Sequence, residues 1–285
     1  MKLSHSITYI IFKQLKKILG SMSPKSRYRL STSLASLLFK SKYLRSKQAQ
    51  KNLRKAFPYW SEKKILYILK KTYVFFTNNF VEFIATPKSW NGIEISVSGK
   101  NILESSLKKN RGVIFISGHF GAWEILGKWL GENTDLFVGI ALRQKNRGAN
   151  KFFHEQREIP GTKQIYKKES LDKAYQVLKK NGVLGLVSDQ DSKKKGVFVN
   201  FFGYSASTPK GAALFHLNTH APIVLGVCVK TGFKQYQIKL MPVPTISKSI
   251  EGITQSYTTK LEECIKKYPE QYFWFHRRWK TKKQL

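Results

Sequence analysis

The stretch VIFISGHFGAWE, residues 113–124, carries more information about the fold than any other part of the 285-residue chain. Its first five residues are almost continuously apolar and end at Ser117, which predicts a buried strand. Two glycines then flank His119, and a helical pattern continues through about Leu130. A buried strand that turns directly into a helix is the unit from which α/β domains are built.

The same alternation of apolar runs and helical stretches continues toward the C-terminus. Buried strands are predicted at residues 136–141, 183–188 and 222–229, where each apolar run is bounded by Gly, Asn or Pro, and a more exposed strand at 235–240. Helices are predicted between and after them at residues 149–158, 170–180, 210–219 and 253–268. We therefore predict an α/β fold with a mixed, largely parallel central sheet flanked by helices.

The N-terminal part of the chain does not follow this alternation. Residues 6–19 and 27–39 are predicted to be helices, and a longer helix is expected from residue 62 to about 85, with Ser61 as its N-cap. The first two helices have two open interpretations. They could lie on a membrane surface as amphipathic helices, or they could pack on the rest of the protein.

Charge is distributed unevenly along the chain. The protein has 51 Lys and Arg residues against 17 Asp and Glu, a formal net charge of +34, and residues 1–61 contain 14 basic residues and no acidic one. A cationic arm suits a nucleic-acid backbone or an anionic lipid surface, although a Lys-rich proteome would also explain it. We predict two parts: basic amphipathic membrane-associating helices in residues 1–45 and an α/β domain in residues 46–285.

Composition excludes several classes of protein. With 41% apolar and 13% aromatic residues, the chain is not a disordered basic tail. The first apolar stretch is interrupted by Lys13, Lys16 and Lys17 before it reaches the roughly 18–20 residues that span a membrane, and no cleavage pattern follows it, so secretion is not expected. Cys228 and Cys264 have neither metal-type nor redox-type spacing, so no metal is expected.

The strongest candidate for chemistry is the pair His119 and Glu124. Side chains five residues apart point about 140° apart on one regular helix, so the two meet only if His119 lies on the turn before the helix. Glu124 could then accept a hydrogen bond from one imidazole nitrogen while the other removes a proton from a hydroxyl group. Backbone N–H groups near Gly121, or a basic side chain, would hold an oxyanion. A structural His–Glu pair would show the same spacing, so both interpretations stay open.

Five blocks of the sequence resemble one known family. The H-x-x-x-x-E spacing after a buried strand is similar to the H-x-x-x-x-D/E signature of glycerolipid acyltransferases. The blocks narrow the resemblance to the bacterial lipid A biosynthesis acyltransferases, the late lauroyl or myristoyl transferases. They cover roughly residues 45–280 and are NLRKAFPYWSEKKI (52–65), GHFGAWEILG (118–127), LVSDQD (186–191), FFGYSASTPKGAALF (201–215) and YPEQYFWFHRRWK (268–280).

The resemblance implies transfer of a fatty acyl chain from acyl carrier protein to a hydroxyl group of a phosphorylated lipid A precursor, without a metal or cofactor. It implies a peripheral or monotopic location at the cytoplasmic face of the bacterial inner membrane. Carried over to this sequence, His119 and Glu124 match the catalytic pair, Arg157 an essential arginine and Asp189 an essential aspartate. The basic charge independently suits an acidic carrier protein, a phosphorylated acceptor and an anionic membrane surface.

Three further segments are candidates for binding. Asp189 follows a predicted buried strand, at the sheet edge where parallel α/β folds bind ligands, although an aspartate that only caps the next segment would look the same. Lys210, in the segment 201–211, belongs to a loop that contacts an acyl chain or phosphate, or else only to the start of a helix. Aromatic and basic residues alternate in 272–280, which fits a nucleic-acid stacking platform or an interfacial aromatic belt, and the resemblance favours the belt.

Two alternative functions stay open. The same chemistry could act on another phospholipid or glycolipid, because the five blocks do not encode the acceptor. A basic nucleic-acid-binding protein, from a different class, would explain the charge equally well. It would not explain the turn around His119, and no known nucleic-acid-binding motif is present, so we expect no nucleic-acid partner.

Overall fold

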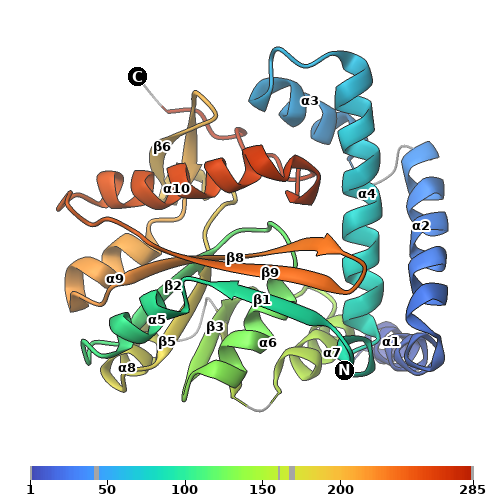
Figure 1. Cartoon of the computed structure of the whole chain (residues 1–285), viewed down its shortest axis with the longest axis horizontal. Helices are drawn as coiled ribbons and strands as arrows, with labels where there is room; N and C mark the ends of the chain where they lie inside the picture. The colour runs from blue at the N-terminus through green and yellow to red at the C-terminus, as the bar shows by residue number, and fades with distance from the viewer. Residues whose placement is uncertain (1, 42–44, 160, 167–170, 284–285) are drawn as a thin grey trace.

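The protein is built around a seven-stranded sheet (Figure 1). The computed structural model describes residues 2–41, 45–159, 161–166 and 171–283. The strands, in their order across the sheet, are β1 (Glu94–Ser98), β9 (Gln235–Pro242), β8 (Ile223–Gly232), β2 (Val113–Ser117), β5 (Val183–Val187), β3 (Phe137–Ala141) and β4 (Thr162–Tyr166). The five strands from β8 to β4 are parallel, whereas β9 is antiparallel to β8 and β1 is parallel to β9. The prediction of an α/β fold with a mixed, largely parallel sheet is therefore confirmed.

Helices cover both faces of the sheet, and a helical layer stands at one side of it (Figure 1). In the described residues these are α1 (Leu3–Ser21), α2 (Pro24–Lys40), α3 (Ser46–Ala56), α4 (Glu62–Ile84), α5 (Lys100–Leu107), α6 (Trp123–Asn133), α7 (Arg147–Arg157), α8 (Leu171–Lys179), α9 (Gly211–Thr219) and α10 (Ile250–Lys267). A two-stranded hairpin of β6 (Val197–Phe201) and β7 (Tyr204–Thr208) packs beside α10, outside the main sheet. The helix predicted at 170–180 is present from Leu171, and residue 170 lies outside the described residues.

The sheet has an apolar core on each face. Ile114 and Ile116 of β2 belong to the core that contains α8, α9 and α10, whereas Val113 and Phe115 belong to the core that contains α5 and α6. All four side chains are buried. Because successive residues of a strand point to opposite faces, a strand covered on both faces needs an almost continuous apolar run. This is why the central strands were predictable from sequence.

The helices α1, α2 and α4 form the layer at the side of the sheet (Figure 1). Helix α2 packs along α4, and α1 packs on α7 and α4. Phe12 of α1 stacks on Phe152 of α7 with ring centroids 5.0 Å apart. The buried Arg27 of α2 donates to the carbonyl groups of Leu19 and Met22 and so holds the end of α1. The N-terminal helices therefore do pack on the α/β domain, and among the described residues no helix has both the length and the apolar content to cross a membrane.

The sequence patterns missed the strands β1 and β4, the helices α3 and α5, and the hairpin. β1 and β4 are the edge strands, and their residues are half-buried or exposed, so they lack the apolar run of the central strands. In the hairpin, Phe202 and Gly203 form a two-residue turn with positive φ at both positions. The segment 201–211 is thus not a loop but the end of this hairpin followed by the start of α9.

The aromatic block near the C-terminus belongs to the core. Tyr272, Trp274 and Phe275 are buried. The amide of Asn52 on α3 donates to the carbonyl groups of Trp274 and His276, each at 2.6 Å. The prediction of an interfacial aromatic belt is therefore wrong, because these three side chains are buried in the core and the backbone of the block is hydrogen-bonded to α3.

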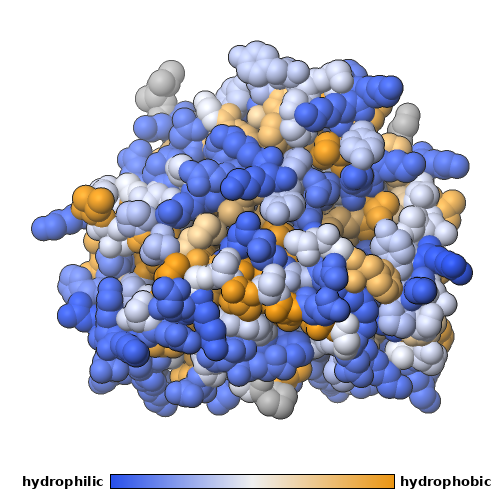
Figure 2. All heavy atoms as spheres, in the orientation of Figure 1, coloured by the Kyte–Doolittle hydropathy of each residue, from blue (hydrophilic) through white to orange (hydrophobic). Residues whose placement is uncertain are grey.

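Hydrophilic side chains cover most of the face shown in Figure 2, with apolar side chains exposed in patches between them. The formal net charge of +34 adds that positive charge dominates among the ionised side chains. A surface so rich in one sign of charge attracts anionic partners over distances of about a Debye length.

Candidate active site

The two neighbouring strands β2 and β5 place His119 beside Asp189. Their register aligns Ser117 with Val187, the last residue of each strand, and His119 and Asp189 each lie two residues further on. His119 Nδ1 is 2.8 Å from Asp189 Oδ1, which is a hydrogen bond between an imidazole and a carboxylate. The pair lies at the carboxyl edge of the parallel strands, where α/β folds bind ligands.

Asp189 is a buried carboxylate that remains ionised. Its side chain is only 2% exposed, and burial acts to raise its pKa. The charge of His119, the hydrogen bonds from it and the charge of Arg278 outweigh burial, so the pKa of Asp189 is lowered. The His119 side chain is 31% exposed. Its second ring nitrogen can therefore reach a substrate while the first stays bound to Asp189.

Backbone hydrogen bonds fix the turn that carries His119. The His119 carbonyl accepts from the N–H of Phe273 at 2.9 Å, and the N–H of Gly121 donates to the carbonyl of Gln271 at 2.8 Å. Gly121 has a φ of +64°, and a Cβ atom there would collide with the carbonyl of Cys228. Only glycine fits this position, because it alone combines a positive φ with so close an approach of two backbones.

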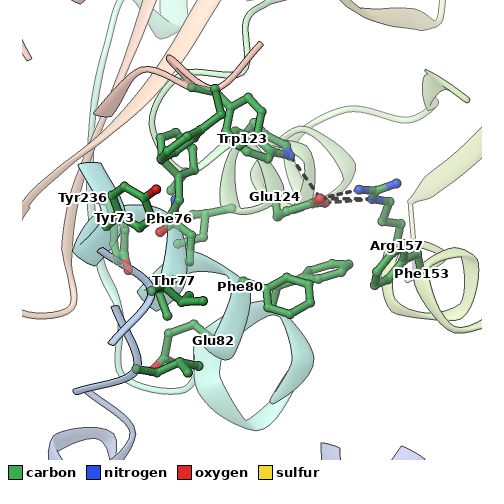
Figure 3. A pocket seen from close by; sticks show the side chains of 18 of the residues that line it. Tyr73, Phe76, Thr77, Phe80, Glu82, Trp123, Glu124, Phe153, Arg157 and Tyr236 are labelled. Carbon is green, nitrogen blue, oxygen red and sulfur yellow. Dashed lines mark hydrogen bonds and ion pairs between the residues drawn. The ribbon is translucent and has the colours of Figure 1, made fainter. Parts of the chain in front are cut away.

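Glu124 forms an ion pair with Arg157 (Figure 3). Glu124 lies on the first turn of α6, and Arg157 is the last residue of α7. Arg157 Nη2 is 2.6 Å from Glu124 Oε1, and Arg157 Nε is 3.0 Å from Glu124 Oε2. Trp123 Nε1 also donates to Glu124 Oε1 at 3.1 Å. Burial acts to lower the pKa of Arg157, but the charge of Glu124 and the hydrogen bonds to it raise it overall.

The structure arranges His119, Glu124, Arg157 and Asp189 in two pairs, and the partners are not the ones expected from the sequence. A hydrogen bond between His119 and Glu124 is not among those of the described residues. Asp189 holds His119 instead, because the strand register brings them together, and Arg157 holds Glu124. The expected imidazole–carboxylate pair exists, but the carboxylate comes from the segment that follows β5 and not from α6.

Two other residues predicted for the site, Gly121 and Lys210, have surroundings that do not support the roles expected of them. The N–H of Gly121 is already bonded to Gln271, so it is not a free donor for an oxyanion. Lys210 is exposed at the N-cap of α9, and no interaction among the described residues links it to His119 or Asp189. We therefore drop Gly121 as an oxyanion donor and leave Lys210 without a role.

Sequence reasoning missed two basic residues near Asp189. Arg278 is buried and donates to the carbonyl of Ser207 at 2.7 Å and to Thr208 Oγ1 at 2.5 Å. The pKa of His276 is lowered by burial, an effect that the charge of Asp189 opposes. The only sequence signal for either residue was its place in the block 268–280. That block was interpreted from its aromatic residues.

An apolar pocket of about 880 Å³ adjoins the site (Figure 3). The ring of His119 packs edge-on against that of Trp123, with centroids 5.6 Å apart, and lies 6.2 Å from the ring of Phe273. Both of these rings line the pocket, as do Glu124 and Arg157. Most of the other lining residues are apolar or aromatic and include Leu34, Leu38, Phe76, Phe80, Phe83, Trp90, Ile125, Phe153 and Phe275. His119 therefore lies beside an opening that suits a long apolar group.

The described residues contain no group of three or more His, Cys, Asp or Glu side chains that could hold a metal ion. Cys228 is buried in the core, and burial raises the pKa of its thiol. A thiol in such surroundings is a poor nucleophile. Among the described residues, the pair of His119 and Asp189 is therefore the strongest candidate for catalysis.

Fold and site together define an α/β protein with an imidazole–carboxylate pair at the edge of its parallel strands and an apolar pocket beside it. Comparison with known proteins adds the family. The sequence matches the family described as "Bacterial lipid A biosynthesis acyltransferase" over residues 1–281. The chain belongs to the bacterial lipid A biosynthesis acyltransferase family.

Sequence identity to individual relatives is low. The chain is 26% identical over 193 residues to the phosphatidylinositol mannoside acyltransferase of Mycolicibacterium smegmatis, which covers 66% of this chain and 63% of the relative. It is 26% identical over 190 residues to the lipid A biosynthesis palmitoleoyltransferase of Escherichia coli K12, covering 65% and 61% of the two chains. It is 25% identical over 268 residues to the lipid A biosynthesis lauroyltransferase of Escherichia coli K12, covering 90% and 85%. The match thus spans less than two thirds of the length of the first two relatives.

We expect Gly121→Ala to lower the free energy of unfolding by about 2 kcal/mol or more, because a positive φ and a collision with backbone both oppose a side chain there. Gly211→Ala is the matched control, since Gly211 begins α9 and an added Cβ meets nothing within 4 Å. Urea unfolding of both variants measures the difference. Equal stabilities would show that the turn around His119 tolerates a side chain.

Proposed function

We propose that this protein transfers a fatty acyl chain from a thioester to a hydroxyl group of a lipid A precursor, with His119 as the general base. The observation that carries the proposal is the hydrogen bond between His119 and Asp189 beside the apolar pocket. A base that is oriented by a carboxylate can activate a hydroxyl group, and a pocket of this kind suits an acyl chain. Membership of the family supports acyl transfer to a lipid acceptor.

Asp189 determines which imidazole nitrogen acts. With the proton on Nδ1 in the hydrogen bond to Asp189, Nε2 of His119 presents its lone pair. Nε2 takes the proton of the acceptor hydroxyl as the oxygen attacks the thioester carbonyl. When the tetrahedral intermediate collapses, the carbon–sulfur bond breaks, the ester remains, and the thiolate leaves with the proton from His119. The Asp189 carboxylate stabilises the imidazolium that exists between these two steps.

Glu124 and Arg157 have a positioning role in this proposal. Their bidentate ion pair joins the start of α6 to the end of α7. Ala122 gives α6 no side-chain cap, so the first N–H groups of this helix have no side-chain acceptor at the N-cap. These groups, which also carry the positive end of the helix dipole, are the donors that we assign to the oxyanion. They replace the N–H of Gly121, which is already bonded to Gln271.

We further propose acyl carrier protein as the acyl donor and a phosphorylated lipid A precursor as the acceptor, with no cofactor. Both substrates are anionic, and the formal net charge of +34 favours their approach. A second candidate acceptor is a phosphatidylinositol mannoside or a similar glycolipid. The observation in its favour is the similarity to a protein named for that activity.

The helix α1 is our candidate for attachment to an anionic membrane, at the cytoplasmic face of the inner membrane. One side of the helix is docked on α7 through Phe12. Its other side exposes apolar residues at helical spacing, namely Leu3, Ile7, Ile10, Ile11 and Ile18. An apolar stripe on a helix that also carries exposed lysines suits the interface of an anionic membrane. The assignment of residues 1–45 as membrane-associating and 46–285 as the acyltransferase domain rests on this stripe.

Replacement of His119 by Ala tests the proposed function. We expect kcat/KM for acyl transfer to fall by roughly 10²–10⁴-fold, because the general base is lost. The substrates are acyl carrier protein thioesters and a lipid A precursor, and mass spectrometry of the lipid product gives the rate. His216→Ala is the control, since that imidazole lies on α9 and bonds to the backbone carbonyl of Ala221 just after the helix. A near-normal rate in a folded His119→Ala variant would remove the central assignment.

The variants Asp189→Asn and Glu124→Gln show which carboxylate acts with His119. Asp189 orients His119 and stabilises the imidazolium that forms between the two proton transfers, so loss of its charge should reduce kcat/KM by roughly 10²–10⁴-fold, close to the loss in His119→Ala. Glu124→Gln should lose only positioning, so we expect a smaller reduction of kcat/KM. The opposite pattern would restore Glu124 as the partner of His119.

Membrane attachment through α1 is tested by Ile18→Glu against Leu171→Glu. Both side chains are exposed, by 57% and 65%, and both variants change the net charge equally. Only Ile18 lies on the apolar stripe, so its replacement should weaken sedimentation with anionic vesicles by about tenfold or more, given what burial of one such side chain contributes. Equal binding of the two variants would place the attachment elsewhere.

A further inference from the structure

One end of the apolar pocket carries a charged side chain that has no role in the proposed function. Glu82 of α4 lines the pocket, and its Oε1 accepts a hydrogen bond from Arg27 Nε at 3.1 Å. Arg27 is 2% exposed, and its remaining hydrogen bonds go to the carbonyl groups of Leu19 and Met22. The ion pair is therefore held rigidly where α1, α2 and α4 meet.

Two further polar side chains lie near Glu82. Burial lowers the pKa of Lys230 on β8, an effect that the charge of Glu82 opposes, and Lys230 Nζ donates to Asn78 Oδ1 at 2.6 Å. Tyr236 of β9 lines the pocket, and its pKa is raised by burial and by the charge of Glu82. Glu82 therefore has cations and a phenol around it, and Figure 3 shows it apart from the other ion pair of the lining, Glu124–Arg157.

The charged end lies away from the site of chemistry. Trp123 and Phe273, whose rings pack against His119, line the pocket at one end, and Figure 3 shows Trp123 and Glu82 at opposite ends of the lining. Along α4 the lining extends from Tyr73 to Phe83, and Glu82 lies nine residues or about 14 Å after Tyr73. The α4 residues between them include the aromatic side chains of Phe76 and Phe80.

We infer that the Arg27–Glu82 ion pair forms the floor of an acyl-chain pocket and sets the longest chain that the protein transfers. This rests on the proposed function, in which the thioester lies at His119 and the chain extends into the pocket. The terminal methyl group of a chain that fits stays among apolar side chains. A longer chain would have to desolvate a carboxylate and disturb its cation, which costs more than the burial of two further methylenes gains.

The test uses the full-length protein with a homologous series of saturated acyl carrier protein thioesters that differ by two carbons, each with the same lipid A precursor. The quantity to compare is the ratio of kcat/KM for the donor two carbons above the wild-type optimum to kcat/KM for the optimum. Glu82→Ala removes the floor, so we expect this ratio to rise about tenfold, as burial of two more methylenes predicts. Arg27→Met/Glu82→Ala removes both charges and should give the same rise without leaving a buried cation unpaired.

Leu34→Ala is the matched control. Leu34 lines the pocket from α2, two helical turns after Arg27, so its loss widens the side of the pocket without deepening it. We expect kcat/KM to change for all donors together, with the ratio within about twofold of wild type. An unchanged ratio in folded Glu82→Ala and in the double variant, with transfer retained, would overturn the chain-length inference alone. Failure of the wild-type protein to transfer any donor would instead remove the proposed function.

Discussion

The arrangement of the site depends on the register between the parallel strands β2 and β5. Because Ser117 lies opposite Val187, the residues that follow the two strands emerge side by side, and His119 and Asp189 come within hydrogen-bond distance. Both strands are covered on both faces, so a shift of one residue would turn buried apolar side chains to the wrong face. The packing of the core thus fixes the geometry of the chemical pair.

The second determinant is the helical layer that holds the pocket. Helix α4 supplies a wall of the pocket, and α2 supports α4 along its length. Helix α1 packs on α7, and Arg157, the last residue of α7, forms an ion pair with Glu124 at the start of α6. A helix whose outer stripe we assign to the membrane is therefore connected through packed side chains to the ion pair beside His119. Substitutions on the inner side of α1 should for this reason affect the site as well as attachment.

Much of the fold and the place of the candidate site were predictable from the sequence, because the central strands are buried on both faces and the turn around His119 has a distinct pattern. The edge strands β1 and β4 were not, since half-exposed strands carry weaker patterns. His119, Glu124, Arg157 and Asp189 were all named as site residues, but their pairing was not predictable. Pairing depends on which strands are neighbours in the sheet, and spacing along the chain does not contain that information. The same gap made a buried aromatic segment, with Trp274 at its centre, look like a surface belt.

The coupling between His119 and Asp189 tests the central claim most directly. It is obtained from kcat/KM of His119→Ala, of Asp189→Ala and of the double variant, measured with one acyl carrier protein thioester and one lipid A precursor. If Asp189 acts only through His119, the double variant should be no slower than His119→Ala, within about twofold. If the two losses multiply, the residues act independently, and the hydrogen bond between them is not the basis of catalysis.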